Sequence, residues 1–127
     1  MAGDVVRTVV FVCEHGAGKS RVAAALFGAA GPRGWRATSA GVTPQETVSV
    51  HAARLLAGDA AAEFLDPSPP RRVAPDAADV VVGIDCDLPG ARRWKLAGEW
   101  PAERAREELR VLVAGLAAEL GQWGSRR

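Results

Sequence analysis

Eight consecutive residues near the start of the chain combine the residue types needed to hold an anion and to attack it. They are Cys13, Glu14, His15, Gly16, Ala17, Gly18, Lys19 and Ser20, together called the 13–20 loop. Gly16 and Gly18 allow the backbone to curl, so that consecutive N–H groups can face one anion. Lys19 adds a full positive charge. The same field favours the thiolate form of Cys13, which makes this residue the expected nucleophile, with Ser20 donating a hydrogen bond to its sulfur.

The segments on either side of the 13–20 loop predict a strand before it and a helix after it. Residues 5–12 form a nearly continuous β-branched apolar run, which is typical of a strand buried on both faces of a parallel sheet. Residues 20–28 predict a helix that ends at a glycine. A helix N-terminus carries roughly half a positive charge, so residues 14–20 are expected to bind an oxyanion.

Strand and helix patterns alternate along the rest of the chain. Strands are expected at residues 35–40, 62–65 and 79–84, and helices at 49–57 and 101–121. Residues 66–72 contain three prolines and cannot be regular structure, and residues 85–100 predict a long loop. The last helix has one apolar stripe, formed by Ala105, Leu109, Leu112, Leu116 and Leu120. This alternation predicts an α/β sheet with helices on both faces.

Cys13 and Asp85 each follow a strongly predicted strand. Right-handed crossover connections place the loops after parallel strands at one edge of the sheet, where such folds have their functional sites. We therefore expect Asp85 to lie beside Cys13 and to support the 13–20 loop. Ser39, near the end of the next predicted strand, is expected to support the loop by hydrogen bonds.

The composition sets the broad class of the protein. The chain has 127 residues, which predicts a single domain over residues 1–127. A formal charge of +1 does not indicate a nucleic-acid partner, and no apolar run approaches the roughly 20 residues of a membrane-spanning helix. The N-terminal residues lack the layout of a signal peptide, so a cytoplasmic location is expected. Cys13 and Cys86 are expected to be free thiols, and no ligand spacing predicts a metal or another cofactor.

One alternative assigns the 13–20 loop to nucleotide binding. Gly18, Lys19 and Ser20 match the end of a P-loop, Gly-x4-Gly-Lys-Ser/Thr, and residues 80–85 resemble a strand that ends in a magnesium-binding acid. The first glycine of that motif would fall on Cys13, however, and the chain carries no evident base-recognition motif. This alternative predicts magnesium-dependent binding of ATP or GTP.

The 13–20 loop more closely resembles that of the low-molecular-weight protein tyrosine phosphatases and the related thioredoxin-coupled arsenate reductases. Their loop follows an apolar strand and has the pattern Cys-x5-Arg-Ser/Thr, to which residues 9–20 are similar. The similarity continues through Ser-Ala-Gly at 39–41, the acidic-ended strand at 79–85 and the proline that precedes the last helix. The resemblance implies a three-layer α/β/α fold with a four-stranded parallel sheet.

The same resemblance implies a hydrolase that uses the Cys13 thiolate on a phosphorylated substrate, either a protein phosphotyrosine or a small phosphoester. The second function that it implies is an arsenate reductase or other thiol redox enzyme, with Cys86 as the partner of Cys13. Because the chain has no third cysteine, a complete relay would need an external thiol reductant. A third hypothesis is a module that binds a phosphate-like or arsenate-like anion without turning it over.

Two positions depart from the family's pattern. Lys19 stands where the family has an arginine, and a lysine offers one compact charge in place of a planar fork that grips two oxygens. Trp100 stands where the family has the aspartate that protonates the leaving group. Glu99 is the nearest carboxylate and is predicted to transfer this proton, with Asp85 and Asp87 as further candidates at the same edge. Arg21 is expected to point away from the anion and not to replace the missing arginine.

Overall fold

The computed structural model describes residues 6–74 and 78–122. Its elements follow the chain in the order β1 (Arg7–Cys13), α1 (Lys19–Ala30), β2 (Trp35–Gly41), α2 (Val50–Leu56), the 3₁₀ helix η1 (Ala60–Phe64), β3 (Val80–Ile84), β4 (Arg92–Trp94) and α3 (Glu103–Gly121). The strands form one parallel four-stranded sheet in the order β2–β1–β3–β4. This confirms the predicted α/β fold and its sheet. Val5, where the first strand was expected to begin, lies outside the described residues.

Strand β1 occupies the centre of the sheet because its side chains suit burial on both faces. It pairs with β2 along its whole length and with β3 from Val9 to Val12. Phe11 on one face and Val12 on the other are both fully buried. The Phe11 ring lies 6.0 Å from that of Phe27 and 5.6 Å from that of Trp94, measured between centroids. The apolar run before the 13–20 loop thus fixes where Cys13 emerges.

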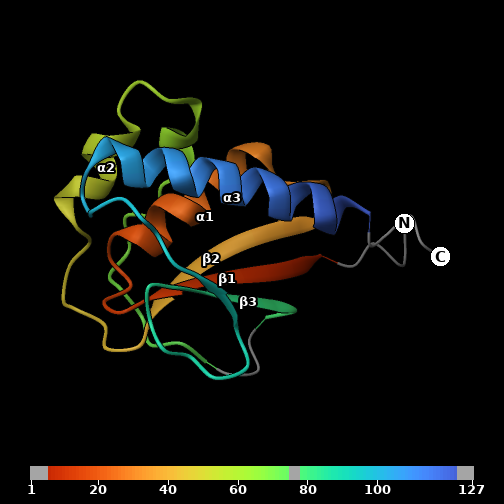
Figure 1. Cartoon of the computed structure of the whole chain (residues 1–127), viewed down its shortest axis with the longest axis horizontal. Coiled ribbons are helices and arrows are strands. Elements are labelled where there is room, and N and C mark those ends of the chain that lie inside the picture. The colour runs from red at the N-terminus through yellow and green to blue at the C-terminus, as the bar shows by residue number, and fades with distance from the viewer. Residues whose placement is uncertain (1–5, 75–77, 123–127) are drawn as a thin grey trace.

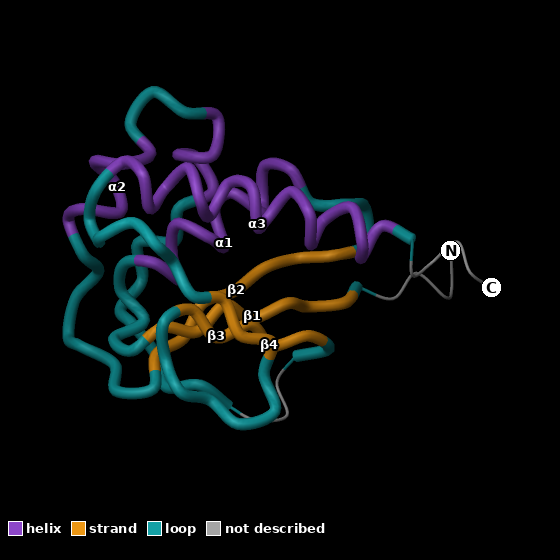
Figure 2. Tube along the Cα trace, in the orientation of Figure 1, coloured by secondary structure: helices purple, strands orange, loops and turns teal. Residues whose placement is uncertain are grey.

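All helices of the described residues gather over one face of the sheet (Figures 1 and 2). On this face, Val9 and Phe11 pack in one cluster with residues of α1, α2, η1 and α3. The opposite face is covered by side chains from connecting segments and strand β3: Val42, Val73, Ala78, Val81, Cys86 and Leu88. The sequence pattern predicted helices on both faces. The layers differ for two reasons. Residues 85–91, which join β3 to β4, are too few for a crossover helix, and both helices between β2 and β3 pack on the same face as α1.

Two short elements differ from the sequence prediction. Residues 62–65 were predicted as a strand but lie in or directly after η1, because the Asp59 carboxylate accepts a hydrogen bond from Ala61 N (2.9 Å) and starts a helical turn. Residues 85–100 were predicted as a loop but contain β4, an edge strand that pairs with β3. Two of the three residues of β4 are arginines, so the segment has no apolar strand pattern. Charged residues are common on partly exposed edge strands such as this one.

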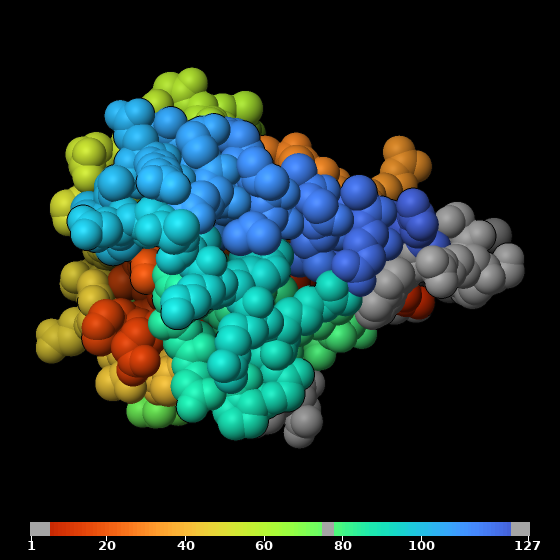
Figure 3. All heavy atoms as spheres, in the orientation of Figure 1, coloured from red at the N-terminus to blue at the C-terminus, as the bar shows by residue number. Residues whose placement is uncertain are grey.

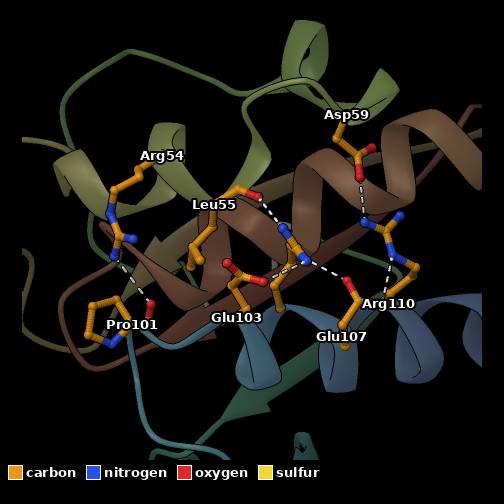
Figure 4. A network of polar contacts seen from close by, with 8 residues as sticks. Arg54, Leu55, Asp59, Pro101, Glu103, Glu107 and Arg110 are labelled. Carbon is orange, nitrogen blue, oxygen red and sulfur yellow. Dashed lines mark hydrogen bonds and ion pairs between the residues drawn. The ribbon is translucent and has the colours of Figure 1, made fainter.

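Helix α3 begins at Glu103, two residues after the predicted start, because Ala102 occupies the N-cap position. Its buried face includes Val113 and Ala117, whereas Leu112 of the predicted stripe is only partly buried. Arginines attach α3 to its neighbours (Figure 4). Arg106 donates to the carbonyl of Leu55 at the end of α2 (3.0 Å). No helix among the described residues is both long and apolar enough to cross a membrane.

Candidate oxyanion site at the end of strand β1

The carbonyl groups of the 13–20 loop are held from outside the loop. Four of them accept hydrogen bonds from the segment after β2: Cys13 O from Val42 N (3.1 Å), Glu14 O from Thr43 N (2.7 Å), His15 O from Gln45 N (3.2 Å) and Ala17 O from Ser49 N (3.0 Å). Gly16 O accepts from the Arg21 guanidinium (3.0 Å), and Gly18 O accepts from Val22 N (3.0 Å). Every peptide carbonyl from residue 13 to 18 is therefore bound by a donor.

This arrangement leaves the N–H groups of the loop without backbone acceptors. In a trans peptide, the C=O and the following N–H point in opposite directions. Because the carbonyls are turned toward the surrounding chain, the following N–H groups face the other way. Outside the helices and strands of the described chain, no backbone hydrogen bond is donated by residues 14–18. A ring of free N–H groups of this kind binds an anion.

Close backbone contact with β2 fixes the shape of the loop. Gly16 has φ of +64°, a conformation that side chains disfavour. A Cβ atom at this position would lie 2.7 Å from Gly41 N, and one on Gly41 would lie 2.6 Å from Gly16 N. The predicted Ser-Ala-Gly motif therefore supports the loop through the bare backbone of Gly41. Ser39 itself is buried in β2 opposite Phe11 and does not line the cavity described below.

Helix α1 points its N-terminus into the same site. Gly18 is the N-cap residue and has no side chain to accept from the first N–H groups of the helix. Uncapped N–H groups at a helix start attract negative charge. Cys13, at the end of β1, is 6% exposed, and its sulfur lies 3.2 Å from the hydroxyl oxygen of the buried Ser20. Strand and helix thus place a thiol, a hydroxyl and a positive dipole end together, as the sequence predicted.

Lys19 and Asp85 face each other across the site. The Lys19 ammonium donates to Asp85 Oδ2 (2.8 Å), and both side chains are partly exposed, at 23% and 20%. Asp85 Oδ1 accepts from Leu96 N (2.9 Å). Asp85 itself has φ of +51°, which aims its carboxylate toward Lys19 instead of continuing β3. The predicted proximity of Asp85 to the loop is confirmed, and its two oxygens both act as acceptors.

A cavity of about 200 Å³ opens above the thiol. Its walls come from the 13–20 loop, from the segment after β2 and from the end of β3: Cys13, Glu14, His15, Ala17, Gly18, Lys19, Gln45, Ser49, Ile84, Asp85 and Trp100. In Figure 3, red-orange atoms of the loop reach the surface between the yellow-orange segment that follows β2 and the cyan segment that leads into α3. His15 Nδ1 lies 3.3 Å from Thr43 O, which holds the ring at the rim.

Trp100 packs directly on the loop. A Cβ on Gly18 would lie 2.6 Å from Trp100 Cζ2, so only glycine leaves room for the indole. The carboxylates predicted to transfer a proton are distributed unequally. Asp85 lines the cavity, whereas Glu99 is exposed and does not line it. The structure therefore brings Cys13, Lys19, Ser20 and Asp85 together but leaves Glu99 apart from them.

Cys86 lies below the sheet, on the face opposite the helices. Its sulfur is 3.5 Å from the carbonyl oxygen of Val12, and both Cys86 and Cys13 are free thiols. Burial raises the pKa of the Cys86 thiol, and the neighbouring Cys13 raises it further. Cys86 is therefore held in its protonated, less nucleophilic form.

Sequence reasoning missed the role of Arg21. Its guanidinium is 1% exposed and donates to the carbonyls of Gly16 (3.0 Å) and Asp66 (2.6 Å), behind the loop. As expected, it does not replace the family's arginine. One feature of the sequence could have indicated this role. A basic residue in the first turn of a helix is opposed by the helix dipole, so Arg21 at this position indicates a compensating interaction. No cluster of three or more metal-ligating side chains occurs among the described residues.

Comparisons with known proteins agree with this geometry. No protein-family model and no curated protein matches the sequence. An arsenate reductase from Archaeoglobus fulgidus is 32% identical, with a TM-score of 0.70, over 87% of this chain and 98% of that chain. A thioredoxin-dependent arsenate reductase from Corynebacterium glutamicum is 25% identical, with a TM-score of 0.60, over 98% of this chain and 63% of that chain. A low-molecular-weight protein tyrosine phosphatase from T. tengcongensis shares the fold at 18% identity, with a TM-score of 0.65, over 89% of this chain and 99% of that chain.

Proposed function

The chain belongs to the superfamily of low-molecular-weight protein tyrosine phosphatases and arsenate reductases, as a diverged member, and we propose that it hydrolyses phosphomonoesters through a Cys13 thiolate. One observation carries this proposal. The bound carbonyls of residues 13–18 leave a set of N–H groups free around a buried thiol that lies 3.2 Å from Ser20 Oγ. Such a site holds three phosphoryl oxygens while the sulfur attacks from below.

The reaction has two steps. The Cys13 thiolate attacks phosphorus, the S–P bond forms, and the P–O bond to the leaving group breaks with its electron pair on oxygen. Water then attacks the cysteinyl phosphate, releasing inorganic phosphate and the thiolate. The loop N–H groups and Lys19 stabilise the negative charge on the phosphoryl oxygens. The Ser20 hydroxyl accepts from the Cys13 thiol at 3.2 Å, and once the sulfur is a thiolate the hydroxyl donates to it instead.

Proton transfer to the leaving group is the weak part of this site. Trp100 carries no acidic proton, Glu99 does not line the cavity, and the Asp85 oxygens accept from Lys19 and Leu96 N. We infer that aryl phosphates, whose leaving groups depart as stable anions, are better substrates than alkyl phosphates.

The test is hydrolysis of p-nitrophenyl phosphate by the wild-type protein, Cys13→Ser and Cys86→Ser. We expect Cys13→Ser to lower turnover by at least about 10³-fold, because the hydroxyl is a far weaker nucleophile. Cys86→Ser is the matched control and should retain turnover, since its thiol lies across the sheet. Absence of turnover in the wild-type protein over a wide pH range contradicts the proposal.

Arsenate reduction is the second candidate function, because the two similar structures with 32% and 25% sequence identity are both arsenate reductases. The Cys13 thiolate would attack arsenic and displace hydroxide, and a second thiolate would then attack the Cys13 sulfur. Arsenic leaves as arsenite with the electron pair, and the two thiols become a disulfide. Because the pKa of Cys86 is raised, we propose an external thiol for the second attack. Arsenite formation that disappears in Cys86→Ser would instead assign that attack to Cys86.

A further inference from the structure

A second positive charge lies behind the 13–20 loop, in the protein interior. Arg21 sits in the first turn of α1 and its side chain is 1% exposed. A buried charge is costly unless it is compensated, and a cation at this end of a helix is also opposed by the dipole. Burial lowers the pKa of Arg21, while the Asp66 carboxylate raises it. The fold therefore retains a cation at a position that disfavours one.

The guanidinium acts on the loop through one peptide group. Its Nε donates to the carbonyl of Gly16 (3.0 Å), and the N–H of the same peptide belongs to Ala17, which lines the cavity. A cation bound to the oxygen of a peptide polarises that peptide and strengthens its N–H as a donor. Arg21 thus adds positive potential on the cavity side without touching a bound anion.

The charge of Arg21 is only partly neutralised by its counterion. The Asp66 carboxylate lies 3.8 Å from the guanidinium, is 43% exposed, and is shared with Arg71 at 3.5 Å. The stronger contact of Arg21 is with the Asp66 carbonyl oxygen (2.6 Å), a neutral acceptor. A buried guanidinium whose main acceptors are carbonyls keeps a field that reaches the nearby loop.

We propose that Arg21 is a positioning residue of the oxyanion site, whose buried charge behind the Gly16 carbonyl favours both the Cys13 thiolate and a bound phosphate. This rests on the proposed function. The coupling is reciprocal, because a Cys13 thiolate also raises the pKa of Arg21. Arg21 thereby supplies from behind part of the positive potential that Lys19 supplies in front.

The experiment measures the pH midpoint of Cys13 alkylation by iodoacetamide, followed by mass spectrometry, and the affinity for inorganic phosphate by calorimetry. Arg21→Met removes the charge and should raise the midpoint by about one pH unit and weaken phosphate binding about tenfold. Arg21→Lys keeps a charge and should restore most of the shift. Arg106→Met is the control, because Arg106 also donates to a main-chain carbonyl, that of Leu55 at the end of α2, and to none of the loop carbonyls.

Asp66→Asn gives a test of opposite sign that does not depend on the folding of the Arg21 variants. This substitution keeps the carbonyl that binds Arg21, keeps a side-chain oxygen for Ser68 N, and removes the negative charge shared by Arg21 and Arg71, so the midpoint should fall and phosphate should bind more tightly. A merely structural role predicts no such shift. An unchanged or higher midpoint in Asp66→Asn overturns the inference, as does an unchanged midpoint in folded Arg21→Met.

The other titratable side chains near the Cys13 thiol are the same in all of these variants. Lys19, Asp85, Glu14 and His15 line the cavity with Cys13, and Cys86 lies across the sheet. Arg71, which shares Asp66, is exposed, so Arg71→Gln should move the midpoint less than Asp66→Asn. If wild-type Cys13 titrates like a free thiol, the proposed function fails. If wild-type Cys13 is acidic but none of the variants shifts it, only the inference about Arg21 fails.

Discussion

The two walls of the cavity are held by different kinds of hydrogen bond. On one side, the carbonyls of the 13–20 loop are bound mainly by backbone N–H groups of the segment after β2 and of α1. On the other side, carboxylates hold the main chain of residues 96–98: Asp85 accepts from Leu96 N, and Glu108 of α3 accepts from Ala97 N (2.8 Å) and from Gly98 N. The loop is held mainly by main-chain donors, whereas residues 96–98 opposite it are held by side-chain acceptors.

This difference explains which part of the site has diverged. A site formed by main-chain N–H groups tolerates replacement of side chains, so under the proposed function we expect the loop to bind an anion with Lys19 instead of an arginine. A proton donor is one side chain, and a single substitution removes it. At position 100 a tryptophan now packs on Gly18. Under the proposed function, the wall that binds the anion retains its main chain, and the wall that would supply the proton departs from the family's pattern at Trp100.

The largest effect is expected from damage to the backbone wall. Gly16→Ala places a Cβ at φ of +64° and 2.7 Å from Gly41 N, so the loop must deform. We expect a loss of at least about 2 kcal/mol in the free energy of unfolding and a loss of phosphate binding of at least about tenfold. Calorimetry and thermal melting measure the two effects.

Gly34→Ala is the control for this change. Gly34 also has a positive φ, of +87°, but a Cβ there meets no atom within 4 Å. It should lower stability by about 1 kcal/mol and leave phosphate binding intact. If Gly16→Ala binds phosphate as well as Gly34→Ala, the loop backbone is not the binding element.

An effect of similar size is expected from repair of the side-chain wall. Trp100→Asp places a carboxylate at the position where the family has its proton donor and removes the indole that packs on Gly18. We expect turnover of phenyl phosphate, a substrate with a poor leaving group, to rise by about 10²-fold, with a smaller change for p-nitrophenyl phosphate. Trp100→Asn opens the same space without an acid. Equal gains in both variants would show that space, and not a proton, limits the reaction.

The smallest effect is expected from loosening the anchor of the side-chain wall. The N–H groups of Ala97 and Gly98 hold the pKa of Glu108 below its usual range. A carboxylate with a lowered pKa stabilises the fold above the unfolded-state value of about 4.3, and this contribution is lost as the pH falls through the lower folded-state value. Melting curves below about pH 5 should therefore separate wild type from Glu108→Gln less than curves at neutral pH. A difference that grows in acid would contradict this assignment.

Much of the fold could be predicted because the strong patterns are local. The β-branched run of β1, the apolar end of β3 and the stripe of α3 each bury a surface that their own spacing defines. The short elements could not be predicted. Strand β4 forms by pairing with the edge of β3, and η1 forms where the Asp59 carboxylate caps it. Neither interaction produces a hydrophobic periodicity in the sequence.

The sequence by itself determined the local setting of the 13–20 loop, and from it predicts the nucleophile and the class of site. Cys13 followed by two glycines, Lys19 and Ser20, between a buried strand and a helix, allows few arrangements other than an anion loop, because the strand fixes where the chain emerges and glycine permits the turn.

Only the tertiary structure decided how that loop is held and what faces it. The donors to its carbonyls come from residues 42–49 and from Arg21. The ion pair of Lys19 comes from Asp85, 66 positions along the chain, and Glu99, adjacent to Trp100, lies outside the cavity. Hydrogen bonds and ion pairs between distant segments depend on the packing of the whole sheet, whereas the residues that make the loop possible are local.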